Sequence, residues 1–389
     1  MDIETRVRRR RTGGEETGLI DLEALSPVAH VPEPSGRGPT LERLLDHLDP
    51  ALDGRLPPNA YVYGPFGAGK SAVVRALFDH LAGLSTKVGD IVHTTTRART
   101  PPVPSFVTVD TRIADSEFGF YHSVLDGLAD EEVPEHGVGT TQLRERIHER
   151  LADATVGVVV AVDHVGEPGS LSGDRLAELF AGLPSTVSWL AVGRDPPSEV
   201  SLTEYTARSI QIDRYGRQAL VDVLTARADD GTGRRVLAYD HARRIAEWAD
   251  GNAHHALAAA FVAADRARQD GRATVSAADV TGAIRAVPRA SVSLGRVLSL
   301  PENRRRVLAV VAALPADERT SVSTTTDAVV DDPSVDLSGT TVRRVLYELA
   351  EVGILERIQA EETAGKGRPP SRVEVRFPAV VFRRLTRRE

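Results

Sequence analysis

Gly64-Pro65-Phe66-Gly67-Ala68-Gly69-Lys70-Ser71 is a complete phosphate-binding loop of the form G-x-x-x-x-G-K-S/T. The glycines allow backbone N–H groups to approach phosphate oxygens without a Cβ in the way. The spacing predicts that Lys70 reaches the β- and γ-phosphates and that the Ser71 hydroxyl binds Mg²⁺. The expected ligand is therefore a nucleoside triphosphate with Mg²⁺, and the predicted binding residues are Gly64, Pro65, Phe66, Gly67, Ala68, Gly69, Lys70, Ser71 and Ala72.

The segments on either side of the loop support this interpretation. Residues 60–63 form an apolar run that is typical of a buried strand, and residues 71–78 have the pattern of a helix. The N-terminus of that helix adds positive potential where phosphates would bind. Further strands are predicted at residues 105–110, 156–162 and 187–192, and helices at 41–48, 142–151 and 174–183. This alternation predicts a doubly wound α/β domain with a parallel sheet.

The second half of the chain has a different pattern. Helices are predicted at residues 218–228, 240–249, 254–269 and 277–287, which together indicate a helical domain. Beyond a proline-bracketed linker, helices at 302–314 and 340–351 precede two strand-like pieces, 354–360 and 372–377. This order is typical of a winged helix. The predicted domains are a disordered tail (1–18), a P-loop domain (19–200), a helical lid (201–290) and a winged helix (295–389).

Composition excludes several classes of protein. The 389 residues contain no cysteine, so neither disulfide bonds nor cysteine-based catalysis is available. No apolar run approaches the roughly 20 residues that a membrane helix needs. The basic N-terminus lacks the apolar stretch of a signal peptide. We therefore expect a cytoplasmic protein without a membrane partner.

The formal net charge of −7 is unevenly distributed. Residues 294–389 contain 16 Lys+Arg and 14 Asp+Glu, so the acidic excess lies in the rest of the chain. The predicted helix at 340–351 directs Thr341, Arg343, Arg344 and Tyr347 away from its apolar face, which suits a DNA major groove. Lys366, Arg368 and Arg372 of the predicted wing suit phosphates or a minor groove. A solvated basic face and a protein-binding winged helix are the alternatives.

Asp163 follows the apolar run 156–162, at the sheet edge where nucleotides and their metal ions bind. We predict that it holds Mg²⁺ together with Ser71. His164 stands where hydrolytic P-loop enzymes commonly carry a glutamate. It could act as a base or mark a lost catalytic position, and we favour loss. The adjacent His254 and His255 are expected to be exposed, and Asp110, Asp115 and Glu117 to be loop or cap carboxylates.

The order of these parts resembles the archaeal origin-recognition initiators of the Orc/Cdc type, a branch of the AAA+ ATPases. The resemblance covers the chain from about Leu25 to Phe377. It implies an AAA+ P-loop sheet with a helical lid and a C-terminal winged helix. Asp213-Arg214-Tyr215 is similar to the family's Pro-Tyr element, and 251–257 is similar to its sensor-2 segment. Carried over residue by residue, the resemblance implies that Tyr215, Arg227 and His254 contact ATP or ADP.

The departures from the family pattern concentrate where hydrolysis takes place. The sensor-2 arginine is replaced by His254 and His255, the Asp-Glu pair by Asp163-His164, and the sensor-1 asparagine by Arg194. An arginine cannot accept a hydrogen bond from a nucleophilic water, although it can hold a γ-phosphate. We therefore treat Asp163, His164 and Arg194 as the candidate catalytic positions, and expect weak or absent turnover.

Three functions are consistent with the sequence. The first is a replication initiator, or a diverged paralogue, that binds double-stranded DNA at origin-like repeats; a replicative helicase or further copies of the chain on DNA would be additional partners. The second is a nucleotide-sensing transcriptional regulator without enzymatic activity. The third is an active motor ATPase, which the departures disfavour. The protein is expected in the cytoplasm, associated with the nucleoid.

Overall fold

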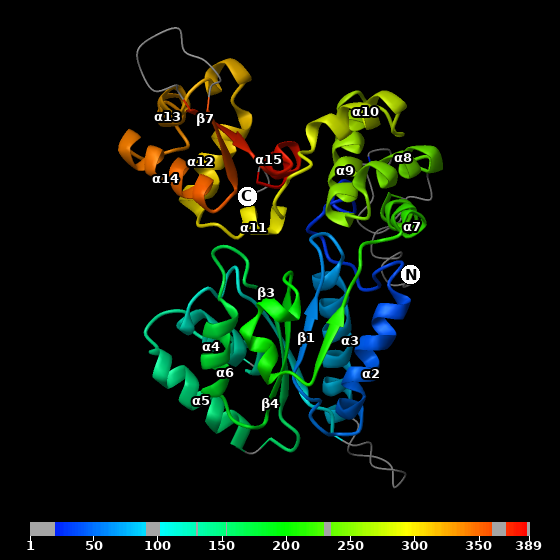
Figure 1. Ribbon diagram of the computed structural model, residues 1–389, viewed down its shortest axis with the longest axis vertical. Coiled ribbons are helices and arrows are strands. Elements are labelled where there is room, and N and C mark those ends of the chain that lie inside the picture. The colour runs from blue at the N-terminus through cyan, green and yellow to red at the C-terminus, as the bar shows by residue number, and fades with distance from the viewer. Residues whose placement is uncertain are drawn as a thin grey trace. The chain divides into compact units, whose positions relative to one another are not determined.

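The computed structural model describes residues 20–90, 102–129, 131–152, 154–228, 235–359 and 371–386, without the side chains of 85–90 and 316. These residues form two compact units (Figure 1). The P-loop unit runs from His30 to Tyr215. The helical unit combines residues 20–29 with the described residues from Gly216 onward. In the described part of the chain, no helix combines the length and apolar character needed to cross a bilayer.

A five-stranded parallel sheet forms the centre of the P-loop unit, with strand order β2-β3-β4-β1-β5. The α/β fold and its parallel sheet are therefore confirmed. The strands are β1 (Ala60–Tyr63), β2 (Ser105–Asp110), β3 (Val158–Val165), β4 (Val187–Gly193) and β5 (Arg208–Gln211). The phosphate-binding loop directly follows β1, which lies between β4 and β5.

Helices cover both faces of this sheet (Figure 1). Strand β3 shows the reason: Val159 and Ala161 are buried with residues of α2 (Gly38–Leu52) and α3 (Lys70–Asp90). Its alternate residues, such as Val160, are buried with residues of α4 (Glu117–Leu128), α5 (Thr140–Ala152) and α6 (Gly173–Ala181). A strand with two buried faces has no polar alternation, which accounts for the unbroken apolar run in the sequence.

Two elements of this unit were absent from the sequence prediction. Strand β5 is a short edge strand in which only Ile210 is buried. Helix α4 begins at Glu117, one of the carboxylates predicted for a loop or cap. Its N-cap is Ser116, whose hydroxyl accepts a hydrogen bond from the Gly119 N–H at 3.1 Å. Two short 3₁₀ helices, Pro197–Glu199 and Ser201–Tyr205, connect β4 to β5.

The helical unit begins with the lid: α7 (Arg217–Ala228), α8 (Tyr239–Ala249), α9 (Ala253–Gln269) and α10 (Ala277–Ala286). All four were predicted. Helix α9 is buried along most of its length, in keeping with its alanine-rich sequence. Helix α10 starts with a capping box, in which Ser276 and Asp279 satisfy each other's backbone N–H groups.

The C-terminal domain comprises the rest of this unit. Its elements are α11 (Leu294–Leu298), α12 (Glu302–Ala313), a 3₁₀ turn (Ala316–Arg319), α13 (Val322–Val330), α14 (Gly339–Glu351), β6 (Leu355–Gln359), β7 (Ser371–Val375) and α15 (Ala379–Thr386). Strands β6 and β7 pair antiparallel. Helices α12 and α14 and the hairpin are the elements predicted for a winged helix, whereas α11, α13 and α15 were not predicted. The residues 360–370 between the strands, including Lys366 and Arg368, lie outside the described residues.

Candidate nucleotide site

The phosphate-binding loop has a backbone that requires glycine. Gly64, Gly67 and Gly69 have φ angles of 152°, 76° and 78°, where other residues are strained. A Cβ on Gly64 would lie 2.1 Å from the carbonyl oxygen of Ile212, the residue after β5, so this backbone also excludes a side chain there. The loop therefore presents its backbone, not side chains, at the N-terminus of α3.

Lys70 is buried directly beneath this loop. Its Nζ donates to the carbonyl oxygens of Gly64 at 2.7 Å and Pro65 at 3.0 Å. Burial lowers the pKa of Lys70 to about 8, helped by the charges of Arg194 and Arg37 and opposed by those of Asp163 and Glu167. The loop thus holds an ammonium group that is short of compensating negative charge, a suitable partner for phosphate.

Asp163 lies at the carboxyl end of β3, in register with Asp110 of β2. Its backbone carbonyl accepts from the Thr111 hydroxyl at 2.7 Å, and its Oδ1 accepts from the His164 N–H at 2.8 Å. Asp110, predicted as a loop or cap carboxylate, instead ends β2 and forms a partly buried ion pair with Arg112 at 2.5 Å. Burial alone would raise the pKa of Asp110, but the hydrogen bond and charge of Arg112 outweigh it and lower that pKa.

His164 has the left-handed backbone conformation, with φ at 66°, and a register shift separates Val162 from Val165 in the pairing with β4. A non-glycine residue held in this region is strained, which is a feature of functional sites. Its Nδ1 lies 3.1 Å from Glu167 Oε1, and its Nε2 lies 3.5 Å from Asp163 Oδ2. Burial opposes the charged form, but these two carboxylates prevail and raise the pKa of His164.

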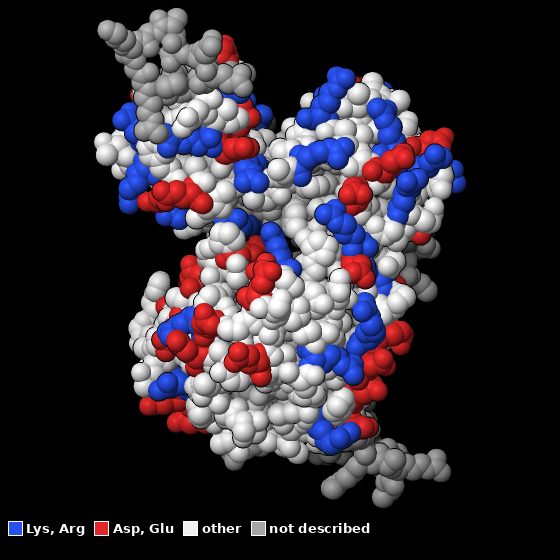
Figure 2. Space-filling view, viewed as in Figure 1, with Lys and Arg blue, Asp and Glu red and all other residues white. Residues whose placement is uncertain are grey.

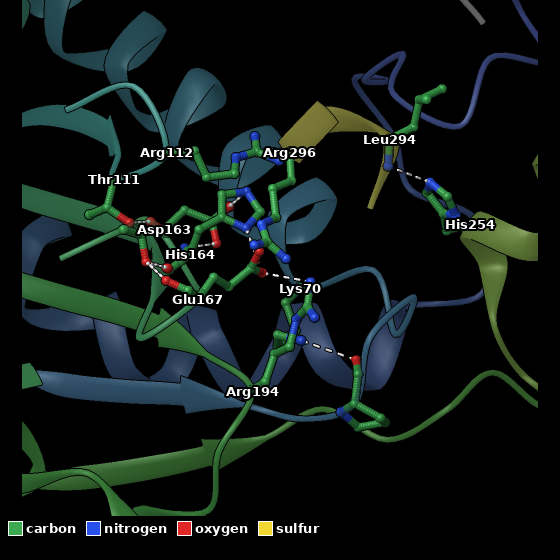
Figure 3. Close-up of polar contacts among 12 residues, drawn as sticks. Lys70, Thr111, Arg112, Asp163, His164, Glu167, Arg194, His254, Leu294 and Arg296 are labelled. Carbon is green, nitrogen blue, oxygen red and sulfur yellow. Dashed lines mark hydrogen bonds and ion pairs between the residues drawn. The ribbon is translucent and has the colours of Figure 1, made fainter. Parts of the chain in front are cut away.

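Glu167 completes the cluster, and sequence reasoning missed it. It lies on a turn closed by its own N–H and the His164 carbonyl at 3.3 Å. Its buried carboxylate forms an ion pair with Arg194 at 2.8 Å. Figure 3 shows Lys70, Asp163, His164, Glu167 and Arg194 gathered at this edge. The available signal was Gly166, which permits the turn that brings Glu167 back.

Arg194 follows β4 directly, and its neighbour Gly193 is in register with Tyr63, the residue before the loop. Its guanidinium carbon lies 4.8 Å from the centroid of the Phe66 ring. The side chain is 33% exposed, so it can change partners. The structure thus brings Arg194 to the phosphate-binding loop, together with Asp163 and His164.

Tyr215 also lies against the loop, because a Cβ on Gly69 would approach its hydroxyl to 2.6 Å. The guanidinium of Arg37 stacks on the Tyr215 ring, with its carbon 3.6 Å from the centroid. Arg37 is itself buried and donates to the carbonyls of Ala68 and Asp213. The sequence interpretation missed Arg37, which comes before the first predicted helix in a glycine-containing segment without a recognisable motif.

Arg227 belongs to the helical unit, where it holds the segment 20–29, here called the strap. Its buried guanidinium donates to the carbonyl of Ser26 at 2.8 Å and that of Ala29 at 3.2 Å, and also to that of Ala24. These contacts could not be predicted from the sequence, because the partners are about 200 residues apart.

His254 and His255 are not exposed, so that prediction was wrong. The buried His254 accepts, through Nε2, a hydrogen bond from the backbone N–H of Leu294 at 3.0 Å (Figure 3). His255 Nε2 lies 2.8 Å from the Ser291 hydroxyl. Both rings therefore fix the linker between the lid and the C-terminal domain. The side chains of His254 and His255 point in different directions, but the linker contacts both of them and so covers both.

The candidate DNA-binding face of α14 has the predicted orientation. Val342, Val345, Leu346 and Leu349 are buried, and Arg343, Arg344 and Tyr347 are exposed. The half-buried Thr341 contacts the N-cap Ser338 through its hydroxyl at 3.0 Å. Arg344 pairs with Glu348 at 3.5 Å, and the exposed Arg372 of β7 pairs with Glu374 at 2.8 Å. Among the described residues, Arg343 forms no ion pair, which makes it the best-placed cation on this helix.

The residues of the P-loop unit fit a nucleotide with Mg²⁺. Phosphates bind to backbone N–H groups and to an ammonium group, and the loop and Lys70 supply both. Mg²⁺ binds oxygen ligands, which the Ser71 hydroxyl and the Asp163 carboxylate supply. The described residues contain no group of three His, Cys, Asp or Glu side chains arranged for a metal. Mg²⁺ takes one or two protein carboxylates and completes its shell with water and phosphate.

Comparison with known proteins agrees with this site. Residues 33–192 match the model of the AAA ATPase domain family. The chain is 25% identical over 347 residues to ORC1-type DNA replication protein 1 of Sulfolobus acidocaldarius, covering 81% of this chain and 80% of that protein. It is 24% identical over 375 residues to ORC1-type DNA replication protein 6 of Halobacterium salinarum, covering 92% and 93%.

Solved structures share the fold. The Aeropyrum pernix ORC1 protein, solved in complex with DNA, matches with a TM-score of 0.64 at 20% identity, covering 96% of this chain and 98% of that one. Cdc6p of Pyrobaculum aerophilum matches with a TM-score of 0.54 at 18% identity, covering 95% and 99%. Residues 33–192 therefore match an AAA ATPase domain, and the chain is similar over most of its length to archaeal ORC1-type DNA replication proteins.

Proposed function

We propose that this chain binds ATP and double-stranded DNA as a replication initiator, or a diverged paralogue of one, with weak or absent ATP hydrolysis. The observation that carries the proposal is the joint presence of the phosphate-binding loop and Asp163 in a homologue of replication initiators. ATP would act as a conformational ligand that sets the arrangement of the protein on DNA. Such a protein would work on the nucleoid, with a replicative helicase or further copies of itself as partners.

In the nucleotide site, Lys70 and the loop backbone would hold the phosphates, and Ser71 and Asp163 would hold Mg²⁺. Bound Mg²⁺ would neutralise charge between the phosphates. The side chain of Tyr215 supports the predicted nucleotide contact, since its hydroxyl reaches Gly69. The hydrogen bonds of Arg227 and His254 favour structural roles instead, because both groups are engaged with backbone of the helical unit.

Weak turnover is proposed from the positions where hydrolysis would take place. His164 lies against two carboxylates, and Arg194 cannot accept a hydrogen bond from water. We expect a steady-state ATPase rate near background, alongside nucleotide binding that Lys70→Ala abolishes. A turnover rate typical of ATPases, about 1 per second or more and lost in Lys70→Ala, would contradict this part of the proposal.

DNA binding is proposed from α14 and the β6–β7 hairpin. The A. pernix ORC1 protein of the same fold was solved with DNA, and Arg343 and Tyr347 are exposed on α14 here. Thr341, Arg344 and Arg372 would contribute further contacts, as would Lys366 and Arg368.

Genome-wide occupancy by crosslinking and sequencing tests the whole proposal. The wild type should give a few sharp peaks over A/T-rich repeats, and the Arg343→Ala/Arg368→Ala variant should lose them. Peaks confined to promoters would contradict an initiator. The absence of peaks would contradict DNA binding through the C-terminal domain.

A further inference from the structure

Glu167 is a negatively charged residue at a site that would bind a ligand with several negative charges, the triphosphate. Its side chain is 5% exposed, and it lies within the cluster that surrounds the phosphate-binding loop. A carboxylate there repels phosphate unless a cation compensates it. Among the described residues, His164 and Arg194 contact this carboxylate, both through the same oxygen, and the charge of Arg112 also acts on it.

The contact between Arg194 and Glu167 has the geometry of an exchangeable pair. Nη2 of Arg194 lies 2.8 Å from Oε1 of Glu167, and His164 Nδ1 lies 3.1 Å from that oxygen. The second oxygen, Oε2, is buried and has no hydrogen-bond partner among the described residues. Arginine and carboxylate bind most strongly when two parallel hydrogen bonds form. A contact through one oxygen leaves much of the guanidinium available to another anion.

The position of Arg194 identifies that other anion. Its guanidinium lies over the ring of Phe66, a residue of the phosphate-binding loop, and it influences the buried Lys70 electrostatically. Lys70 belongs to the part of the loop that receives the β- and γ-phosphates. Arg194 could therefore form an ion pair with an oxygen of a terminal phosphate.

We propose that Glu167 competes with the γ-phosphate of bound ATP for Arg194 and thereby lowers the preference of this site for ATP over ADP. The inference rests on the proposed nucleotide binding and assigns Glu167 as a positioning residue. In the ADP-bound protein Arg194 keeps Glu167 as its partner. In the ATP-bound protein Arg194 turns to the phosphate, and Glu167 retains only His164. Breaking the ion pair between Arg194 and Glu167 costs free energy, which offsets part of the gain from binding the γ-phosphate.

The test compares two fluorescent ligands, the N-methylanthraniloyl derivatives of ADP and of the β,γ-imido analogue of ATP. The measured quantity is the ratio of their dissociation constants, ADP over ATP analogue. Glu167→Gln keeps the shape of the side chain and removes its charge. We expect this variant to raise the ratio roughly 5- to 30-fold, mainly through tighter binding of the ATP analogue.

Two further variants control for general effects. Glu117→Gln removes the same charge from the same unit, where Glu117 pairs with Arg175 at a half-exposed site, and should leave the ratio unchanged. Glu167→Gln should raise the ratio less in the Arg194→Ala background than in the wild-type background, because without Arg194 only the direct repulsion between Glu167 and the γ-phosphate remains to be relieved. Should Glu167→Gln fail to melt cooperatively, Glu167→Asp, whose carboxylate is drawn back by one methylene, is expected to raise the ratio in the same direction.

The outcomes separate this inference from the proposed function. A ratio that stays constant or falls in Glu167→Gln, in a wild type that binds both ligands, overturns the competition and leaves the proposed function intact. A ratio that rises equally in the Arg194→Ala background also overturns it, since the effect would then not pass through Arg194. A wild type that binds neither ligand overturns both.

Discussion

At Lys70 the protein keeps an ammonium group in a buried position, and this has a cost to stability. The pKa of about 8 in the folded state lies below the ordinary 10.5, so folding disfavours the charged form. The cost is complete below pH 8. It is relieved as the pH rises from 8 to 10.5, because the folded protein has then lost this proton while the unfolded chain still binds it.

We therefore predict that Lys70→Met stabilises the nucleotide-free protein relative to wild type at pH 7. This advantage should shrink by on the order of 3 kcal/mol between pH 7 and pH 10.5. Denaturant unfolding of both proteins across this pH range measures the two free energies of unfolding. Subtracting one from the other cancels the contribution of the other titrating groups. If the difference in the free energy of unfolding between Lys70→Met and wild type stayed constant with pH, burial of the charged Lys70 would not destabilise the folded protein.

Asp279 presents the opposite case, in which folding favours the charged form. It is buried, receives two hydrogen bonds from Arg272 at 2.6 and 2.9 Å, and completes the capping box of α10. These hydrogen bonds from Arg272 outweigh burial and hold the pKa of Asp279 well below its ordinary value. Its contribution to stability is complete above pH 4 and is lost as the pH falls below that.

Asp279→Ala should therefore lower the free energy of unfolding by about 2–3 kcal/mol at neutral pH and by less at pH 2. Thermal melts at the two pH values measure this change. Asp270→Ala is a suitable control, because Asp270 pairs with the same arginine at 2.8 Å but is exposed. A loss for Asp279→Ala that is equal at both pH values would contradict the role of its charge.

Single residues also mark the limit of what the sequence could predict at the site. The loop and Asp163 were found because a glycine pattern and a strand end place them at one sheet edge, and Arg194 was found through the resemblance to the initiator family. Glu167 was missed because its position depends on the left-handed backbone of His164, which residue types do not reveal. His254 was wrongly predicted to be exposed because its partner is a backbone N–H forty residues away.

At the scale of elements, the start of α9 behaves as an anchor for the linker. The Leu294 N–H, buried at the start of α11, has His254 Nε2 as its acceptor. His254 must therefore be the neutral tautomer with its proton on Nδ1. An arginine, the residue expected for sensor 2 by resemblance, has no acceptor atom and would bring a charge to this position.

We predict that His254→Arg lowers the free energy of unfolding by about 2–4 kcal/mol, although it restores the family pattern. His254→Gln should cost less than about 1 kcal/mol, because its amide oxygen can accept the same hydrogen bond. Denaturant unfolding distinguishes the two variants. If His254→Arg were as stable as wild type, the linker would not depend on this acceptor.

Elements with strong periodicity could be predicted, and those formed by context could not. All four lid helices and α14 have apolar faces at helical spacing. Helix α13 is rich in valine and threonine, which have low helix propensity, yet Ser321 and Thr324 form a capping box and Thr325 and Thr326 are buried. Strand β5 has one buried residue and exists because its neighbour β1 supplies a parallel edge.

At the scale of the whole molecule, acidic and basic side chains are unevenly distributed along the chain. Figure 2 shows Asp and Glu side chains gathered over helices of the P-loop unit, and Arg side chains over the C-terminal domain. Arg343 is exposed within that domain and forms no ion pair among the described residues, whereas Arg344 is paired with Glu348. Arg343 should therefore contribute most to DNA binding from α14.

We predict that Arg343→Ala weakens binding to the genomic segment with the highest occupancy by about 1–3 kcal/mol, and binding to a scrambled duplex by less. Fluorescence anisotropy at several salt concentrations measures both, because phosphate contacts alone would alter both duplexes equally and change the salt slope. Arg43→Ala, on the exposed face of α2, is the matched control and should have no effect. Equal losses for both variants would contradict a specific role for α14.

The strap also acts at the scale of the molecule, because Arg227 joins chain segments from opposite ends of the P-loop unit. Arg227→Met should remove the guanidinium donor from the Ala24, Ser26 and Ala29 carbonyls, at a cost of about 2–4 kcal/mol, and leave Ser26 with the Ala29 N–H at 3.2 Å. Hydrogen exchange should then accelerate at the Ser26 and Ala29 amides and not in β3. Unchanged exchange at the strap would mean that other contacts hold it.

The same contact has a consequence for the order in which the protein is made. The strap is synthesised before the P-loop unit, yet its partner Arg227 follows about 200 residues later, after the whole P-loop unit has been synthesised. Since domains generally fold as units during synthesis, the P-loop unit can be complete before the strap binds Arg227. Residues 20–29 therefore reach their final contacts late, and a stalled or truncated chain ending before Arg227 exposes them.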